Sequence, residues 1–168
     1  MKVLKDILYK AGITEVIGDT ETPIMSVTAD SRAVELISLF VAVRGTKVDG
    51  HNYIETALEN GAIAIVCEEL PAILNPAITY IRVHDASYAL GHIASNFYGV
   101  PSSRMRLVGV TGTNGKTTCA TLLYNLFSSL GHKCGLISTV ENKIGREVIP
   151  STHTTPDPVS LNKLLAIW

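Results

Sequence analysis

The sequence predicts an α/β fold with largely parallel strands, arranged as two consecutive units. Short apolar runs of β type alternate with amphipathic helical stretches, which is the pattern of α/β domains. A Gly-Val-Pro-Ser-Ser segment interrupts this pattern at residues 99–103, and a glycine-rich segment follows it. The chain has 168 residues, 46% of them hydrophobic and 17% charged. It can therefore form packed cores and is not intrinsically disordered.

The first part of the chain contains three predicted strands and two predicted helices. Apolar runs with the length and composition of buried strands occupy residues 39–43, 63–67 and 79–83. A helix is expected to begin at Tyr53 and to end at Asn60-Gly61, because glycine readily adopts the left-handed conformation of a helix C-cap. A second helix should follow its N-cap Asp85 and continue through Tyr98.

The second part begins after the Gly-Pro break. It is expected to contain a strand at 106–110, a helix at 117–130, a strand at 135–139 and a helix at 159–168. We therefore expect a first domain at residues 1–99, a linker at 100–105 and the beginning of a second α/β domain at 106–168.

Charge, apolar runs and cysteines exclude several classes of protein. The chain has 14 Lys and Arg residues against 15 Asp and Glu residues, so binding to nucleic acid is not expected. No apolar run reaches the ~18 residues of a membrane span, and charges among the first six residues argue against a signal peptide. We expect a cytoplasmic protein in which the buried, reduced thiols are Cys67, Cys119 and Cys134. The histidines lack metal-ligand spacing, and a structural or surface role is expected for His51, His84, His92 and His132.

Residues 110–118, Val-Thr-Gly-Thr-Asn-Gly-Lys-Thr-Thr, lie between a predicted strand and a predicted helix, which is the setting of a phosphate-binding loop. The two glycines let the backbone approach phosphates, and the N–H groups of the loop and helix supply positive potential. Lys116 adds a charge for the β- and γ-phosphates, and the Thr117 hydroxyl is placed to ligate Mg²⁺. The residues expected to bind a nucleoside triphosphate are Gly112, Thr113, Asn114, Gly115, Lys116, Thr117 and Thr118.

This loop departs from the general phosphate-loop pattern at one position. The pattern requires glycine where the chain has Val110, and Gly109 lies one residue too early. The remaining run keeps the chemistry and its setting. The alternative is a glycine-rich turn with an exposed lysine and no nucleotide.

The variant loop resembles that of the Mur ligase family, ATP-dependent enzymes that add amino acids to the peptidoglycan precursor. Asp30-Ser31-Arg32, Leu-Phe-Val-Ala-Val-Arg-Gly at 39–45 and Asp49-Gly50-His51 resemble the first domain of the members that add the third residue or the terminal dipeptide. Ser-Thr-His-Thr-Thr-Pro-Asp at 151–157 favours the third-residue ligase, because the dipeptide-adding members normally have an asparagine-rich segment there. The resemblance covers essentially the whole chain.

The resemblance implies that the acceptor is UDP-N-acetylmuramoyl-L-alanyl-D-glutamate. Its uridine diphosphate is expected to contact Ala29, Ser31, Thr46, Lys47 and Val48, and its muramoyl-peptide part to contact His153, Thr154 and Thr155. Two alternatives remain at these positions. Asp30-Ser31-Arg32 could be an ordinary turn after a strand, and the segment that ends in Asp157 could cap the last helix.

In the reaction that the resemblance implies, ATP phosphorylates the γ-carboxylate of the D-glutamyl residue, and the incoming amine then displaces phosphate. Such chemistry depends on positioning and charge neutralisation, so Lys116, and Thr117 with Mg²⁺, are the expected catalytic residues. The resemblance implies meso-diaminopimelate more often than L-lysine as the added amino acid. The family's carbamylated lysine, adenine contacts and third domain would lie beyond Trp168.

The last helix is expected to end in an apolar run, Leu-Leu-Ala-Ile-Trp, without a cap. We therefore expect the front part of a longer, monomeric ligase with small-molecule substrates, and no ligase activity in this chain alone. Two alternatives are a naturally short module that binds the UDP precursor without catalysis, and a fragment of a dipeptide-adding Mur ligase.

Overall fold

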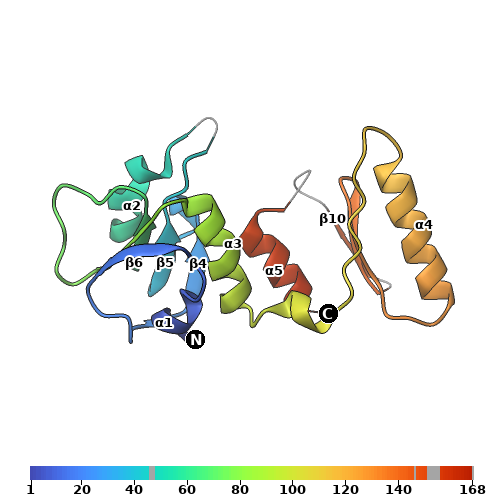
Figure 1. Cartoon of the computed structure of the whole chain (residues 1–168), viewed down its shortest axis with the longest axis horizontal. Coiled ribbons are helices and arrows are strands. Elements are labelled where there is room, and N and C mark those ends of the chain that lie inside the picture. Colours follow the sequence, from blue (N-terminus) through green and yellow to red (C-terminus); the bar gives the residue numbers. More distant parts are fainter. Residues whose placement is uncertain (46–47, 146, 151–155, 168) are drawn as a thin grey trace. The chain divides into compact units, whose positions relative to one another are not determined.

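The computed structural model describes residues 1–45, 48–145, 147–150 and 156–167. The chain forms two compact units, Met1–Pro101 and Ser102–Trp168, called unit 1 and unit 2 below (Figure 1). In the described ranges no helix is long and apolar enough to cross a membrane.

Unit 1 is built on a five-stranded sheet with the order β2-β7-β6-β5-β4. The strands are β2 (Ile13–Ile17), β4 (Ser26–Thr28), β5 (Ser38–Val41), β6 (Ala62–Cys67) and β7 (Thr79–Val83). Strands β4 to β7 are parallel to one another, whereas β2 pairs with β7 in the antiparallel sense at one edge. The predicted α/β fold with largely parallel strands is therefore confirmed.

In the described residues of unit 1, three α-helices and two 3₁₀ helices accompany this sheet. They are α1 (Leu4–Ile7), α2 (Ile54–Glu59), α3 (Ala86–Phe97), η1 (Ser31–Ala33) and η2 (Gly50–Tyr53). A further 3₁₀ helix, η3 (Pro101–Arg104), spans the point in the sequence where unit 1 ends and unit 2 begins. The predicted end of the first helix is confirmed, because Asn60 is the C-cap of α2 and Gly61 after it lies in the left-handed region. The predicted start of the second helix is also confirmed, because the Asp85 side chain caps α3 by accepting from the Tyr88 N–H. The segment expected as a linker, 100–105, contains η3.

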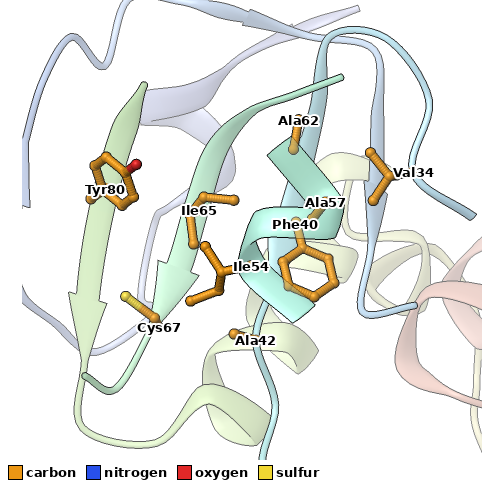
Figure 2. Packing of buried hydrophobic residues seen from close by; sticks show 9 residues of the cluster. All are labelled: Val34, Phe40, Ala42, Ile54, Ala57, Ala62, Ile65, Cys67 and Tyr80. Atoms are coloured by element: carbon orange, nitrogen blue, oxygen red, sulfur yellow. The ribbon is translucent and has the colours of Figure 1, made fainter. Parts of the chain in front are cut away.

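The core of unit 1 lies on both faces of the sheet. All four residues of β5 are buried, so side chains pointing to either face are covered. On one face, α2 and the strands enclose nine buried residues (Figure 2). They are Val34, Phe40, Ala42, Ile54, Ala57, Ala62, Ile65, Cys67 and Tyr80.

The first 28 residues contain elements that the sequence patterns did not predict. Besides α1, β2 and β4, a short antiparallel pair joins β1 (Lys2–Val3) to β3 (Pro23–Ile24). These strands have two to five residues, which is too short for periodicity to become visible.

One residue at the start of β5 has a backbone conformation that disfavours its side chain. Ile37 has φ 65°, a region that β-branched residues rarely adopt. Its N–H donates to the Gly61 carbonyl at 3.0 Å and its carbonyl accepts from the Met25 N–H at 2.9 Å. Two neighbouring segments therefore hold Ile37 in this conformation.

We expect Ile37→Gly to be more stable than Ile37→Ala by about 1 kcal/mol. Both variants lose the same side-chain contacts, but only alanine keeps the steric strain at positive φ. At an ordinary position glycine is instead the less stable of the two by roughly 0.5–1 kcal/mol. Urea unfolding of both variants measures this difference, and an alanine variant at least as stable as the glycine variant would contradict the expectation.

The described residues of unit 2 form, besides most of η3, two α-helices and a three-stranded antiparallel sheet of order β10-β9-β8. These elements are α4 (Lys116–Ser129), β8 (Gly135–Ile137), β9 (Glu141–Ile144), β10 (Glu147–Pro150) and α5 (Pro158–Ala166). Both predicted helices and the strand near 135 are confirmed. The Asp157 carboxylate caps α5 by accepting from the N–H groups of Val159 and Ser160 at 2.9 and 3.1 Å.

The strand predicted at 106–110 is not formed, and Leu107 and Val108 are exposed. A buried strand needs neighbours for its backbone hydrogen bonds. The described residues of unit 2 provide only the β10-β9-β8 sheet, whose strands do not pair with this segment. The prediction of a strand here was therefore wrong for this chain.

The prediction of three buried thiols was also wrong. Cys67 is buried in the core of unit 1, but Cys134 is half-buried and Cys119 is exposed. None of the residues of α4 is buried in the described part of the chain, and Leu122 and Leu126 are exposed beside Cys119. An apolar helix face buries a thiol only where a second element covers it.

We expect iodoacetamide at pH 8 to label Cys119 at least about 100-fold faster than Cys67. Burial raises the pKa of the Cys67 thiol to about 11, so only about one molecule in a thousand carries its reactive thiolate at that pH. Mass spectrometry of timed samples measures both rates. Equal rates in the folded chain would show that Cys67 is not buried.

Candidate functional site

The carboxyl ends of the parallel strands in unit 1 form one candidate binding edge. Ala29 and Ser31 follow β4, and Val48 follows β5, its immediate neighbour in the sheet. Because both strands run in the same direction, the segments that follow them meet at the same edge. Open α/β sheets bind ligands outside this edge. The fold therefore places Ala29, Ser31 and Val48 where a ligand can bind.

The turn after β4 is held by a capping carboxylate. Asp30 accepts from the N–H of Arg32 at 3.0 Å and from its Nε at 2.9 Å. These hydrogen bonds hold the pKa of Asp30 below its usual value, because they stabilise the charged form. The ordinary turn after a strand, which the sequence left open as an alternative, is therefore present. A turn of this kind is compatible with a binding role.

Ser31 is the first residue of η1 and is only 7% exposed. Its carbonyl accepts from the Asn60 Nδ2 at 2.9 Å, so the residue that ends α2 also fixes the position of Ser31. Ala29, in contrast, is exposed. The edge therefore combines a firmly held serine with accessible backbone beside it.

The segment after β5 is tied back to the sheet by charged groups. The Arg44 guanidinium lies 3.4 Å from the carboxylates of Asp49 and Glu68 and 2.6 Å from that of Glu69. The hydrogen bond from Arg44 lowers the pKa of Glu69. The pKa of Asp49 is lowered chiefly by the hydrogen bond from the His51 backbone N–H.

The glycine-rich loop in unit 2 leads directly into α4. Gly115 is the N-cap of this helix with φ 77°, and Gly112 has φ 149°. A Cβ added to Gly115 would meet no atom within 4 Å, so its conformation, and not lack of space, is what requires glycine. The loop predicted to bind phosphate therefore has backbone conformations that depend on its glycines.

The start of α4 offers an anion N–H groups that have no acceptor within the helix. The Cys119 N–H donates to the Gly115 carbonyl at 2.8 Å as the first intrahelical bond. The three preceding N–H groups, of Lys116, Thr117 and Thr118, have no intrahelical acceptor, and the helix dipole adds positive potential there. Thr113, Asn114 and Thr118 are exposed in the same segment.

Lys116 and Thr117 supply a charge and a hydroxyl at this helix end. The Lys116 Nζ donates to the carbonyls of Gly112 and Thr113 at 2.6 and 3.3 Å, which keeps the ammonium over the loop. The Thr117 hydroxyl lies 3.5 Å from that of Thr139, a residue that sequence reasoning did not single out. The N–H groups at the helix start, the ammonium and the hydroxyl together fit a phosphate chain.

The Thr117 hydroxyl can also ligate a magnesium ion that arrives with the phosphates. Mg²⁺ prefers oxygen ligands and is usually held by few protein groups together with phosphate oxygens. Thr117 provides such an oxygen. In the described ranges no group of three His, Cys, Asp or Glu side chains could hold a metal ion without phosphate.

Five of the predicted contact residues lie outside the described residues. They are Thr46, Lys47, His153, Thr154 and Thr155.

Two family models match this chain, one in each of its two units. Residues 23–98 match the model described as Mur ligase family, catalytic domain, and residues 110–167 match the Mur ligase middle domain. The chain belongs to the Mur ligase family. The resemblance inferred from the three motifs is thereby confirmed.

A curated relative allows a more specific comparison of this chain within the Mur ligase family. It is 56% identical over 164 residues to the UDP-N-acetylmuramoyl-L-alanyl-D-glutamate--2,6-diaminopimelate ligase of Cytophaga hutchinsonii. That match covers 97% of this chain and 34% of the relative, so the chain spans about a third of the curated relative's length.

Two solved structures of Mur ligases also match this chain. A structure named for the same ligase activity matches with a TM-score of 0.77 and 26% identity, covering 99% of this chain and 33% of that one. The MurF ligase of Thermotoga maritima, solved with ADP, matches with a TM-score of 0.54 and 28% identity, covering 82% of this chain and 28% of that one.

The sequence did not predict the charged cluster that holds the segment after β5 in this Mur ligase chain. The cluster consists of Arg44, Asp49, Glu68 and Glu69. His51 was expected to be structural or a surface residue, and it does join two segments by hydrogen bonds to Asp49 and Glu68 at the candidate edge. Asp49-Gly50-His51 carried part of the family resemblance. Its position after a predicted strand was the signal in the sequence that could have indicated a role at the sheet edge.

Proposed function

We propose that this chain is the front third of an ATP-dependent ligase that adds meso-diaminopimelate to UDP-N-acetylmuramoyl-L-alanyl-D-glutamate. The observation that carries the proposal is the 56% identity over 164 residues to a ligase named for that reaction. Unit 1 has a sheet edge of the kind at which α/β proteins bind nucleotides, and unit 2 has a helix start of the kind that binds phosphate. Such an enzyme requires both.

Unit 1 is proposed to bind the uridine diphosphate of the precursor. Its contact residues would be Ala29, Ser31 and Val48, together with Thr46 and Lys47. For Ala29, Ser31 and Val48 the support is their position after adjacent parallel strands, where α/β sheets bind ligands. A serine hydroxyl at this edge can bond a phosphate oxygen or a uracil edge without adding bulk.

Unit 2 is proposed to bind the phosphates of ATP together with Mg²⁺. Residues 112–118 would supply N–H groups, Lys116 a mobile positive charge and Thr117 one magnesium ligand. The support is the free helix start and the ammonium held over the loop. The ion would neutralise phosphate charge. His153, Thr154 and Thr155 would contact the muramoyl-peptide part.

The proposed reaction forms an amide bond in two stages. The γ-carboxylate of the D-glutamyl residue takes the γ-phosphoryl group of ATP and becomes an acyl phosphate, with release of ADP. The amine of diaminopimelate then attacks the acyl carbon, and phosphate leaves. Neither stage needs a nucleophilic side chain, so Lys116 and Thr117 would contribute by positioning and charge neutralisation.

Titration calorimetry of this chain with UDP-N-acetylmuramoyl-L-alanyl-D-glutamate tests the part proposed for unit 1. Ser31→Ala should weaken binding by about 10-fold or more, because one hydrogen bond to a charged group is worth roughly 1.5–3 kcal/mol. Ser128→Ala, at an exposed serine of α4, is the matched control. Equal affinity in both variants would remove Ser31 from the site.

The alternatives differ in their support. A dipeptide-adding ligase is less well supported, since the MurF structure matches 82% of this chain with a TM-score of 0.54, whereas the structure named for the diaminopimelate-adding ligase matches 99% of it with a TM-score of 0.77. A naturally short module that only binds the precursor is distinguished by reading the gene past codon 168, where the proposal expects an open frame.

A further inference from the structure

We propose that His51 is a positioning residue for the nucleotide part of the precursor. It ties the segment after β5, called here the β5 loop (residues 43–50), to the end of β6, and so holds Val48 at the edge that also carries Ser31. Of this loop, only residues 43–45 and 48–50 are described, and the loop contacts that support the proposal are made by these residues. The inference rests on the function proposed for unit 1 and names a residue on which that binding depends.

The base of the β5 loop is closely packed. The Gly50 N–H donates to the Val43 carbonyl at 2.9 Å, and the Gly45 N–H donates to the Val48 carbonyl at 2.9 Å. Arg44 and Asp49 form an antiparallel bridge between these two bonds. A Cβ on Gly50 would lie 2.7 Å from the Val43 carbonyl oxygen, so the two strands of the loop approach too closely for any other residue.

The His51 ring connects this loop to β6. Its Nδ1 lies 2.7 Å from the Asp49 Oδ1, and its Nε2 accepts from the N–H of Glu68 at 2.9 Å and from that of Glu69 at 3.4 Å. Because Nε2 accepts, the neutral ring carries its proton on Nδ1 and donates it to Asp49. The imidazole is 13% exposed and uses both nitrogens.

The connection continues from Glu68 into α3. The Glu68 Oε1 accepts from the Ala86 N–H at 2.9 Å, at the first residue of that helix. The other carboxylate oxygen of Glu68 lies 3.4 Å from Arg44 Nη1. The β5 loop is therefore anchored to the ends of two other elements at the proposed binding edge.

This cluster lies outside the hydrophobic core of unit 1. The buried cluster contains neither His51 nor its polar partners, and Asp49, Glu68 and Arg44 are each partly or fully exposed. Loss of the imidazole should therefore loosen the β5 loop without unfolding the sheet. A loop that moves loses affinity, because binding must then order it.

The experiment measures UDP binding to the 168-residue chain by titration calorimetry. His51→Ala should weaken UDP binding at least 10-fold, whereas Asn52→Ala, at the exposed neighbouring residue, should change it less than 2-fold. ADP binding, assigned to unit 2, should be equal in both variants. Amide hydrogen exchange should accelerate at Gly45 and Gly50 in His51→Ala and remain slow in β6.

A core variant separates positioning from general stability. Ile65→Val lowers the stability of unit 1 without touching the loop and should leave UDP affinity unchanged. Should His51→Ala bind UDP as tightly as the unaltered chain, the inference is overturned and the proposed function stands. Should the unaltered chain not bind UDP at all, the function proposed for unit 1 fails, and the inference fails with it.

Discussion

Replacing Lys116 by alanine should weaken binding of ADP with Mg²⁺ by about 10-fold to 100-fold. The Lys116 ammonium lies over the glycine-rich loop, 2.6 Å from the Gly112 carbonyl, where bound phosphates would meet it. Each hydrogen bond between charged groups is worth roughly 1.5–3 kcal/mol, which corresponds to about 10-fold to 150-fold in Kd. Titration calorimetry of the chain with ADP and Mg²⁺ measures this loss.

The matched control for this variant is Lys133→Ala, at an exposed lysine of the same unit. It removes the same charge away from the loop and should change the affinity less than 3-fold. If both variants bind ADP equally well, the loop is a glycine-rich turn with an exposed lysine, the alternative that the sequence left open.

Replacing Phe40 by alanine should destabilise unit 1 by about 3–5 kcal/mol. Phe40 is 1% exposed and lies in β5 within the cluster that α2 covers (Figure 2). Its loss removes buried apolar surface and leaves a cavity that close-packed neighbours can fill only in part. For a domain of about 100 residues, the melting temperature should fall by about 15 °C or more.

Phe127→Ala is the corresponding control in unit 2. Phe127 is 42% exposed, so the same change in composition should cost less than about 1 kcal/mol. Amide exchange of β5 and β6 follows unit 1 separately from unit 2. A Phe40→Ala chain in which these strands exchange as slowly as in the unaltered chain would contradict the packing described for this core.

The sequence predicted those elements whose signals are local and strong. β7 was predicted with its observed ends, Thr79–Val83, because its apolar run is bounded on both sides. The cap at Asp85 was predicted, and the cap at Asp157 was recognised as an alternative, because a carboxylate at a helix start acts on its own nearest residues. The strand at 106–110 could not be judged in this way, since a strand also depends on partners far away in the chain.

The two candidate sites differ in the same way in how far the sequence predicts them. The phosphate-type loop could be predicted because one continuous segment, residues 112–118, contains all its donors. The candidate site at the carboxyl ends of the parallel strands in unit 1 combines segments after β4, β5 and β6. The resemblance supplied Ser31 and Val48, but the bonds from His51 to Glu68 depend on strand order, which no single segment encodes.

The most direct test of the account is the activity of a chimera. This chain is joined to the part of the C. hutchinsonii ligase that it does not cover, about two thirds of that protein. The account expects ATP-dependent addition of meso-diaminopimelate to UDP-N-acetylmuramoyl-L-alanyl-D-glutamate, and its loss in the Lys116→Ala chimera. A folded chimera that binds ADP and the precursor but forms no amide bond would contradict it.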